Sequence, residues 1–258
     1  MGGYMGKEIK GYINVDELKR LIATNSISVQ LRDVVDLPPE LIIEKLVTLT
    51  DDTRARYKRL QKELLLGVRE GENERSVSNV LEKLMRLSQV TSGLVMDELD
   101  QLHDASSEKL TVLEDTIGQI DGKVAVFCRY TRSIDRIADM CKRAGWSYMI
   151  YDGRESDGTL PMQYNESDTK VWIAQLSKGI GYSIPKAKYV VFYELDYSRV
   201  NHNQCKGRNL RAVGSEDGSC CYIYLLCPET IDPTVYKVLK DKDFTAADAM
   251  EYVRGVDK

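Results

Sequence analysis

The sequence predicts an α/β fold, in which helices cover both faces of a mostly parallel β-sheet and a helical and linker segment precedes that sheet. Two observations lead to this prediction. Short continuous apolar runs such as KVAVFC (123–128) are typical of strands that are buried on both faces. From residue 121 onward such runs alternate with helical segments, and strands that alternate with helices form right-handed βαβ units with parallel strands.

Residues 1–40 are predicted to be a tail and connector. Val15 to Ala23 shows helical spacing of apolar residues, and Asp36-Leu37-Pro38-Pro39 forces extended backbone because each proline fixes its own φ. Residues 41–120 are predicted to form a strand plus helical segment. The strand is expected at 41–49, an exposed loop at 67–76, and helices from Asp51, Val77 and near Ser107.

Residues 121–258 are predicted to form the main sheet. Its strands are expected at 123–128, 147–153, 170–176, 188–195 and 219–227, and its helices at 131–145, from Arg199, and from Asp232, which is expected to cap its helix. A polar loop is expected from Arg154 to Asp168, and a capping box at Thr245 predicts a last helix. Such sheets bind ligands at the carboxyl ends of their strands, so a site is expected after Cys128, Gln175 and Leu195 and at the start of the basic helix.

Composition narrows the class of protein. The chain has 258 residues and a formal net charge of -4, and its six cysteines include no CxxC pair. With only His103 and His202 besides, no metal site is predicted, and the cysteines read as small apolar residues of a reduced protein. No apolar stretch approaches the roughly 18 residues of a membrane span. A cytoplasmic or nuclear location without a membrane partner is therefore expected.

One segment of the chain is strongly basic although the net charge of the whole chain is only -4. Between Lys170 and Arg211 the chain has eight basic and two acidic residues, a local charge of +6. Such a strip favours a polyanion at one edge of the sheet, although a solvated charged face is the plain alternative.

The spacing of residues within this strip favours a bound polyanion over a merely solvated charged face. QCKGRNLR places Gln204, Gly207, Arg208 and Arg211 as QxxGRxxR, predicted near the start of a helix, where the two arginines would share a face and converge on phosphate oxygens. Gly207 would allow close approach of a ligand or backbone. Upstream, SKGIGYSI places Gly179 and Gly181 directly after a strand, where free backbone N–H groups could meet a phosphate.

These segments carry a family resemblance. QCKGRNLR is similar to motif VI of superfamily 2 helicases, IAQLSKGIGYSI with the following YVVFYELDYSRVNHNQ resembles motif V and its sequel, and VAVFCRYTRSIDRI resembles motif IV. The segments between residues 26 and 120 resemble, in order, those that precede the second RecA-like lobe of Swi2/Snf2-type DNA translocases. The resemblance covers roughly residues 26–240 and implies a RecA-like C-terminal lobe over 121–258, with the tail of a first lobe before residue 40.

The resemblance also implies roles. Arg208 and Arg211 match arginine fingers that reach the ATP γ-phosphate across an interlobe cleft, and Gln204 matches the motif VI glutamine of that site. Gly179, Gly181 and Ser177 match motif V, which links the ATP state to the nucleic-acid backbone. Phosphate contacts are implied for motif IV and the neighbouring motif V positions: Arg129, Tyr130, Thr131, Ser177 and Lys178. Turn-forming or helix-capping roles remain the alternative for Tyr130, Thr131 and Ser177.

Several departures from the family pattern matter. No G-x-x-x-x-G-K-[ST] occurs, and MDELD (96–100) resembles a Walker B box without a Walker A before it, so an exposed acidic helix end is the simpler reading. ATP and Mg²⁺ are therefore expected to be bound mainly by a missing first lobe, and the isolated chain is expected not to hydrolyse ATP. Asn209 and Leu210 also replace the family's usual residues before Arg211.

Three functions remain open from the sequence. The first is the C-terminal motor lobe of an ATP-dependent DNA helicase or translocase, with RNA not excluded as its substrate. The second is a stand-alone nucleic-acid-binding or adaptor module without an ATPase cycle. The third, a nucleotide-dependent transferase, explains the strand and helix alternation but not QxxGRxxR.

Overall fold

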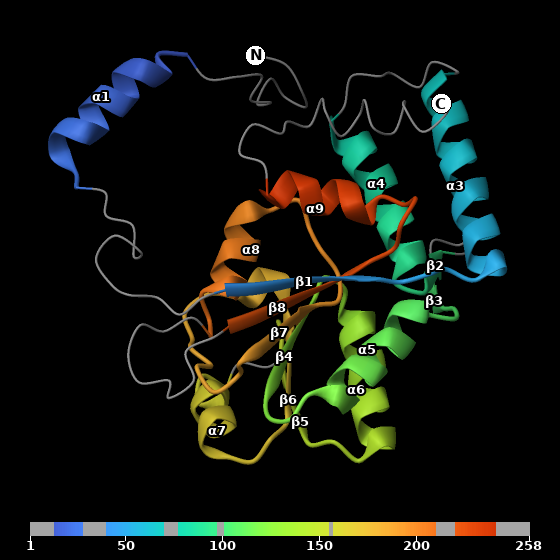
Figure 1. Cartoon of the computed structure of the whole chain (residues 1–258). Coiled ribbons are helices and arrows are strands. Elements are labelled where there is room, and N and C mark those ends of the chain that lie inside the picture. Colours follow the sequence, from blue (N-terminus) through green and yellow to red (C-terminus); the bar gives the residue numbers. More distant parts are fainter. Residues whose placement is uncertain are drawn as a thin grey trace. The chain divides into compact units, whose positions relative to one another are not determined.

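The computed structural model describes residues 13–27, 40–69, 77–96, 101–154, 157–209 and 220–240. The chain divides into two compact units, residues 1–37 and 38–258. The first contains α1 (Val15–Asn25), which confirms the predicted helix and exposes the apolar side chains of Leu18, Leu21 and Ile22. The second contains all other described elements (Figure 1). The division of that second unit at residue 120 stays a prediction.

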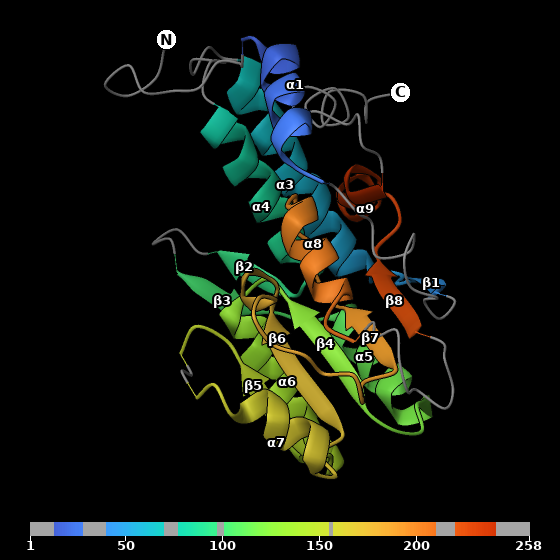
Figure 2. The ribbon, with the colours of Figure 1, turned by 90° about the vertical axis from the view of Figure 1, so that its left-hand side faces the viewer.

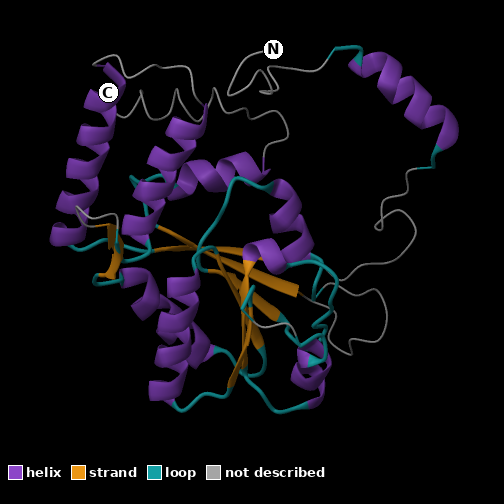
Figure 3. Ribbon diagram, turned by 180° about the vertical axis from the view of Figure 1, so that it is seen from behind, coloured by secondary structure: helices purple, strands orange, loops and turns teal. Residues whose placement is uncertain are grey.

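A six-stranded parallel sheet forms the centre of the second unit (Figures 1 and 3). Its order is β1-β8-β7-β4-β6-β5, and all five neighbouring pairs are parallel. The strands are β1 (Glu40–Leu46), β4 (Val124–Cys128), β5 (Tyr148–Tyr151), β6 (Val171–Gln175), β7 (Tyr189–Phe192) and β8 (Cys220–Leu226). The predicted α/β, RecA-like class with a parallel sheet is confirmed.

Two buried cores lie on the two faces of this sheet, as alternation along β4 shows. Val124, Val126 and Cys128 pack into the core that includes α5 (Glu108–Gln119) and α6 (Thr131–Ala144). Ala125 and Phe127 point the opposite way, into the core on the other face. The helices that contribute to that second core are α3 (Asp51–Arg69), α4 (Val77–Thr91), α7 (Leu160–Glu166), α8 (Arg199–Lys206) and α9 (Asp232–Lys240) (Figure 2).

Two sequence predictions need correction, and one hairpin was missed. The segment from Arg154 to Asp168 contains α7, a two-turn helix with Pro161 in its first turn, and is not merely a loop. Helix α3 continues to Arg69, three residues into the predicted loop. An antiparallel hairpin of β2 (Leu94–Met96) and β3 (Leu102–Asp104) was not predicted. Residues 97–100 of MDELD and the last helix predicted at Thr245 lie outside the described residues.

Strand β1 occupies one edge of the sheet and is held there by polar contacts from both faces. Lys206 Nζ of α8 lies 2.6 Å from Glu40 Oε2, and Lys240 Nζ of α9 lies 2.7 Å from Glu44 Oε1. On the other face Lys45 Nζ donates to Thr116 Oγ1 of α5 at 2.7 Å. The apolar side chains of this strand, by contrast, are half or more exposed at Leu41 and Leu46.

A buried ion pair joins α5 to α9. Lys109 Nζ lies 2.5 Å from Asp232 Oδ2, and the two side chains are 2% and 7% exposed. Asp232 opens α9 as predicted, but its carboxylate does not cap the helix: it also accepts from the Cys227 N–H and from the Thr91 hydroxyl, each at 3.1 Å. Burial lowers the pKa of the Lys109 ammonium, but the nearby anionic groups, Asp232 foremost, outweigh it and raise that pKa above its ordinary value.

The cysteines serve as small buried side chains, as the composition predicted. All six cysteines are unpaired and buried. Over the described ranges, no helix has both the length and the apolar character that crossing a bilayer requires. Over the same ranges, no group of three or more His, Cys, Asp or Glu side chains could hold a metal ion.

Candidate functional site

The loop that resembles motif IV lies at the carboxyl end of the central strand β4. Arg129 and Tyr130 leave the strand, and α6 begins at Thr131, whose side chain is exposed. Glu194, just after β7, lies 1% exposed beside this loop. Its Oε2 accepts the backbone N–H of Arg129 at 2.7 Å and of Tyr130 at 3.0 Å, and its Oε1 accepts the Ser133 hydroxyl. Burial raises the pKa of the Glu194 carboxyl, although these donors oppose the shift.

The side chains of this loop take different directions. The Tyr130 hydroxyl donates to the Met85 carbonyl of α4 at 3.3 Å, and burial raises its pKa to about 12. The ring therefore packs on α4 and does not stand free as a stacking platform. The Arg129 guanidinium lies 5.4 Å from the Tyr130 ring centroid, and its Nη1 is buried without a hydrogen-bond partner among the described residues. A buried cationic donor without a partner is costly, so this nitrogen is a candidate for an anionic ligand.

The segment that resembles motif V lies next to this loop. After β6 the chain makes one 3₁₀ turn, Leu176–Lys178, which leaves the side chains of Ser177 and Lys178 exposed. Gln175, the last residue of β6, donates from Nε2 to the Arg129 carbonyl at 3.4 Å. The structure thus brings Arg129, Ser177 and Lys178 to the carboxyl edge of neighbouring strands, where the sequence predicted a site.

The predicted glycines have distinct surroundings. Gly179 is buried, and a Cβ atom there would lie 2.5 Å from Cys205 Sγ, so its lack of a side chain serves the contact between the motif V turn and α8. Gly181 adopts φ +84°, a left-handed conformation that favours glycine, and has open space around it. Gly207 has an ordinary φ of -71°, and a Cβ there would make only ordinary contacts. The close approach predicted at Gly207 is found at Gly179.

The motif VI arginine requires the main correction at this site. Helix α8 ends at Lys206 and Gly207 is its C-cap, so Arg208 lies beyond the end of the basic helix and not near its start. Arg208 therefore does not occupy a helix face that it could share with Arg211. Arg211 itself lies outside the described residues.

The Arg208 guanidinium binds backbone carbonyls of its own chain. Its Nη1 donates to the Tyr182 carbonyl at 2.6 Å, and its Nε donates to the Gln204 carbonyl at 2.8 Å. The Arg208 carbonyl in turn accepts the Ile184 N–H at 2.9 Å. These bonds fasten the motif V turn to the end of α8. Within the described ranges, Arg208 Nη2 and the buried Gln204 Oε1 make no hydrogen bond. This leaves one donor that fits a phosphate oxygen and one acceptor that fits an N–H or O–H of a partner group.

Sequence reasoning missed Glu194 as a member of this site. The residue lies within the strand predicted at 188–195 and was counted only as one of the two acidic residues of the basic strip. A carboxylate directly after a buried strand, at the edge where ligands bind, was the available signal. The three donors that it accepts come from segments about 60 positions away, so the contact itself could not be foreseen.

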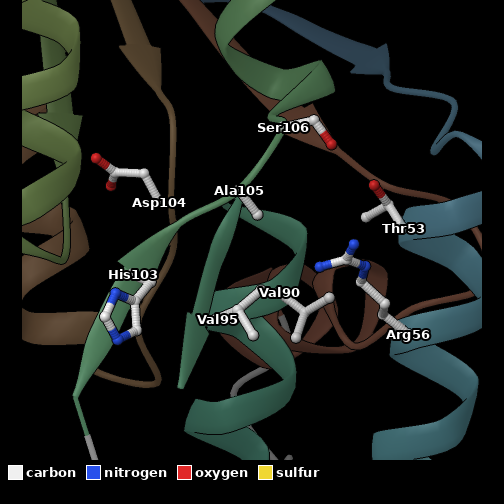
Figure 4. A pocket seen from close by; sticks show the side chains of 8 residues that line it. All are labelled: Thr53, Arg56, Val90, Val95, His103, Asp104, Ala105 and Ser106. Atoms are coloured by element: carbon white, nitrogen blue, oxygen red, sulfur yellow. The ribbon is translucent and has the colours of Figure 1, made fainter. Parts of the chain in front are cut away.

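A cavity of about 350 Å³ lies elsewhere, between α3, α4 and the β2–β3 hairpin (Figure 4). None of the predicted site residues lines it. In Figure 4 the Arg56 guanidinium points into it, while the carboxylate of Asp104 points away. That carboxylate binds Arg132 of α6 through two hydrogen bonds of 2.7 and 3.2 Å.

Known proteins resemble this chain in sequence and in fold. Residues 108–213 match the helicase conserved C-terminal domain. Over 197 residues the chain is 27% identical to Helicase SWR1 of Candida glabrata, and this match covers 70% of the chain but only 13% of that protein. The chain thus spans a small part of the curated relatives it matches.

Solved structures agree on the fold. The C-terminal part of the Fun30 ATPase domain superposes with a TM-score of 0.67 at 14% identity, covering 86% of this chain and 97% of that one. The Sulfolobus solfataricus SWI2/SNF2 ATPase core in complex with dsDNA superposes with a TM-score of 0.63 at 16% identity, covering 93% of this chain and 53% of that one. In sequence the chain is thus similar to the helicase conserved C-terminal domain over residues 108–213, and its fold is that of Swi2/Snf2 ATPase C-terminal domains.

Proposed function

We propose that this chain is the C-terminal motor lobe of an ATP-dependent DNA helicase or translocase and supplies half of the ATPase site. One observation carries the proposal: the motif IV loop, the motif V turn and the end of α8 form one hydrogen-bonded unit, through Gln175 to Arg129 and Arg208 to Tyr182. A shift of either phosphate-facing segment would therefore be transmitted to the other.

Arg208, Arg211 and Gln204 are the proposed catalytic residues. ATP with Mg²⁺, bound mainly by a first RecA-like lobe, would supply the phosphoryl group and the metal that neutralises its charge. The guanidinium of Arg208 would stabilise negative charge on the transferring phosphoryl group, with Nη2 as its open donor. Gly179, Gly181 and Gly207 would allow the motif V and VI backbones to lie close to each other and to the nucleotide.

DNA is the proposed nucleic-acid partner. The exposed Thr131, Ser177 and Lys178 side chains and the Arg129 guanidinium would contact backbone phosphates, and Tyr130 would support this loop by packing on α4. The charge of the surrounding strip and the double-stranded DNA held by the Sulfolobus relative support this assignment. RNA remains a second possible substrate, and a cytoplasmic or nuclear location remains a prediction.

ATP turnover tests the motor proposal. The purified chain with Mg²⁺ and double-stranded DNA is expected to show no turnover, and addition of a Walker-containing first lobe is expected to produce DNA-stimulated turnover. Arg208→Ala or Arg211→Ala should then reduce the rate by about 10³-fold, as removal of an arginine finger does. Lys186→Ala, an exposed basic residue of the same strip, is the matched control and should retain the rate. DNA-stimulated, Mg²⁺-dependent turnover by the chain alone would refute the idea of a half-site.

A nucleic-acid-binding or adaptor module is the second candidate. It is favoured by the Arg208 guanidinium, which two backbone carbonyls of the same chain already hold. If the first lobe restores no turnover while the chain binds DNA, and Arg211→Ala leaves that binding unchanged, the adaptor function is correct.

A further inference from the structure

Glu194 holds the backbone from which Arg129 projects. Arg129 lies between the ends of two strands: its N–H donates to Glu194 beyond β7, and its carbonyl accepts from Gln175 at the end of β6. Both polar groups of its peptide backbone are therefore bound by side chains of other strands. The β-ladder continues up to this point, because the Tyr193 N–H donates to the Phe127 carbonyl at 3.1 Å.

The two oxygens of the Glu194 carboxylate accept different donors, and this fixes the backbone at Arg129. Glu194 Oε2 accepts two successive backbone N–H groups, those of Arg129 and Tyr130, while Oε1 accepts the Ser133 hydroxyl in the first turn of α6. Two successive N–H groups that converge on one oxygen fix the direction of the chain between them. The carboxylate thus orients the turn that aims the Arg129 side chain, and it is too deeply buried to meet a ligand itself.

We propose that Glu194 is a positioning residue for nucleic-acid binding: it sets the backbone of the Arg129–Tyr130 turn so that the Arg129 guanidinium meets a phosphate. This inference rests on the proposed function, because it assumes that Arg129 contacts nucleic acid. It assigns no contact between Glu194 and the ligand. The reach of the carboxylate, not its charge alone, carries the effect.

Two substitutions at Glu194 separate the reach of the side chain from its charge, and a third, at Arg129, is the reference for loss of the phosphate contact. Glu194→Asp keeps the charge but shortens the side chain by one methylene, so it cannot hold both N–H groups at the same backbone position. Glu194→Gln removes the charge but keeps the reach: its carbonyl can accept both N–H groups while its NH₂ donates to Ser133 Oγ. Arg129→Ala removes the phosphate contact itself.

Binding of a fluorescein-labelled 20-base-pair DNA duplex by the full chain, followed by anisotropy over a range of salt concentrations, tests the proposal. Arg129→Ala is expected to weaken binding about tenfold and to reduce the slope of log K against log[salt] by about one. Glu194→Asp should reproduce both effects, whereas Glu194→Gln should stay within about threefold of the wild type. The Arg129→Ala, Glu194→Asp double variant should bind no more weakly than Arg129→Ala alone.

A purely structural role of Glu194 would give a different pattern. Glu194→Asp would then lower the melting temperature while affinity and salt slope stay at wild-type values, and that result would overturn the inference alone. Ser133→Ala, which removes one donor without moving the two N–H groups, is the folding control and should retain the salt slope. If the wild-type chain itself fails to bind the duplex, the DNA-binding part of the proposed function fails, and with it this inference.

Discussion

The buried pair of Lys109 and Asp232 allows a quantitative test of how the lobe is held together. Lys109 belongs to α5 and Asp232 to α9, which cover opposite faces of the sheet. Removal of one partner from a buried ion pair leaves an uncompensated charge and costs about 3–5 kcal/mol. Lys109→Met removes the ammonium and leaves the Asp232 carboxylate with two neutral donors, so a loss in this range is expected.

The expected size can be converted into a melting temperature. For a protein of this size about 2–4 °C is lost per kcal/mol, so Lys109→Met should lower the melting temperature by roughly 6–20 °C. Asp232→Asn should be comparably destabilising, because it leaves the buried Lys109 ammonium without its carboxylate partner. The double variant should lose less than the sum of the two, since neither charge remains buried.

The assay is urea and thermal unfolding followed by circular dichroism. Lys240→Met, which breaks the exposed pair between Lys240 and Glu44, is the matched control and should cost at most about 1 kcal/mol. If Lys109→Met lowered the free energy of unfolding by less than about 1 kcal/mol, the buried pair would not stabilise the lobe as expected. Strictly additive losses in the double variant would lead to the same conclusion.

The remaining predictions concern α8 and its contacts. Burial lowers the pKa of His202 to about 4, so the folded chain binds fewer protons than the unfolded chain between that value and the ordinary 6.5. The contribution of His202 to the free energy of unfolding is therefore fully present above pH 6.5 and falls by about 2 kcal/mol between pH 7.5 and 5. In urea unfolding, the His202→Asn variant should show a flatter dependence of stability on pH than the wild type. The same pH dependence in both proteins would contradict this prediction. Gly179→Ala should cost about 1–3 kcal/mol because its Cβ would meet Cys205 Sγ at 2.5 Å, and Cys205→Ala should recover part of the loss. Gly158→Ala, with open space around it, is the control, and equal melting temperatures for the two alanine variants would disprove the close contact.

Sequence patterns predicted most of the fold because the core strands are unusually continuous. VAVFC and VWIAQ are buried along nearly their whole length, and the alternating helices carry clear apolar faces. Strands β2 and β3 have only three residues each, too few for a periodic pattern to register. Helix α7 spans seven residues and contains both proline and polar side chains, which hides it among loop signals.

The site was harder to predict than the fold. The carboxyl edge of the sheet was correctly expected to gather Arg129, Ser177 and Lys178, because parallel strands end together there. The prediction that Arg208 lies near the start of a helix was wrong, because α8 ends before it. Glycine after a helical segment is a known stop signal, so Gly207 could have marked the end of α8. Lys109 and Glu194 become buried only through partners far away in the sequence, and local patterns carry no information about such pairings.

The position of β1 has a consequence for synthesis of the chain. Glu40 pairs in register with Cys220, so β1 cannot pair with its neighbour β8 until about 180 further residues have been synthesised. At about 5–20 residues per second, a ribosome needs roughly 10–35 s to deliver β8. Throughout that interval the apolar segment LIIEKL is displayed as an unpaired strand on a nascent chain. Chains truncated before residue 220 should therefore aggregate or recruit chaperones, while chains that extend through β8 should close the sheet.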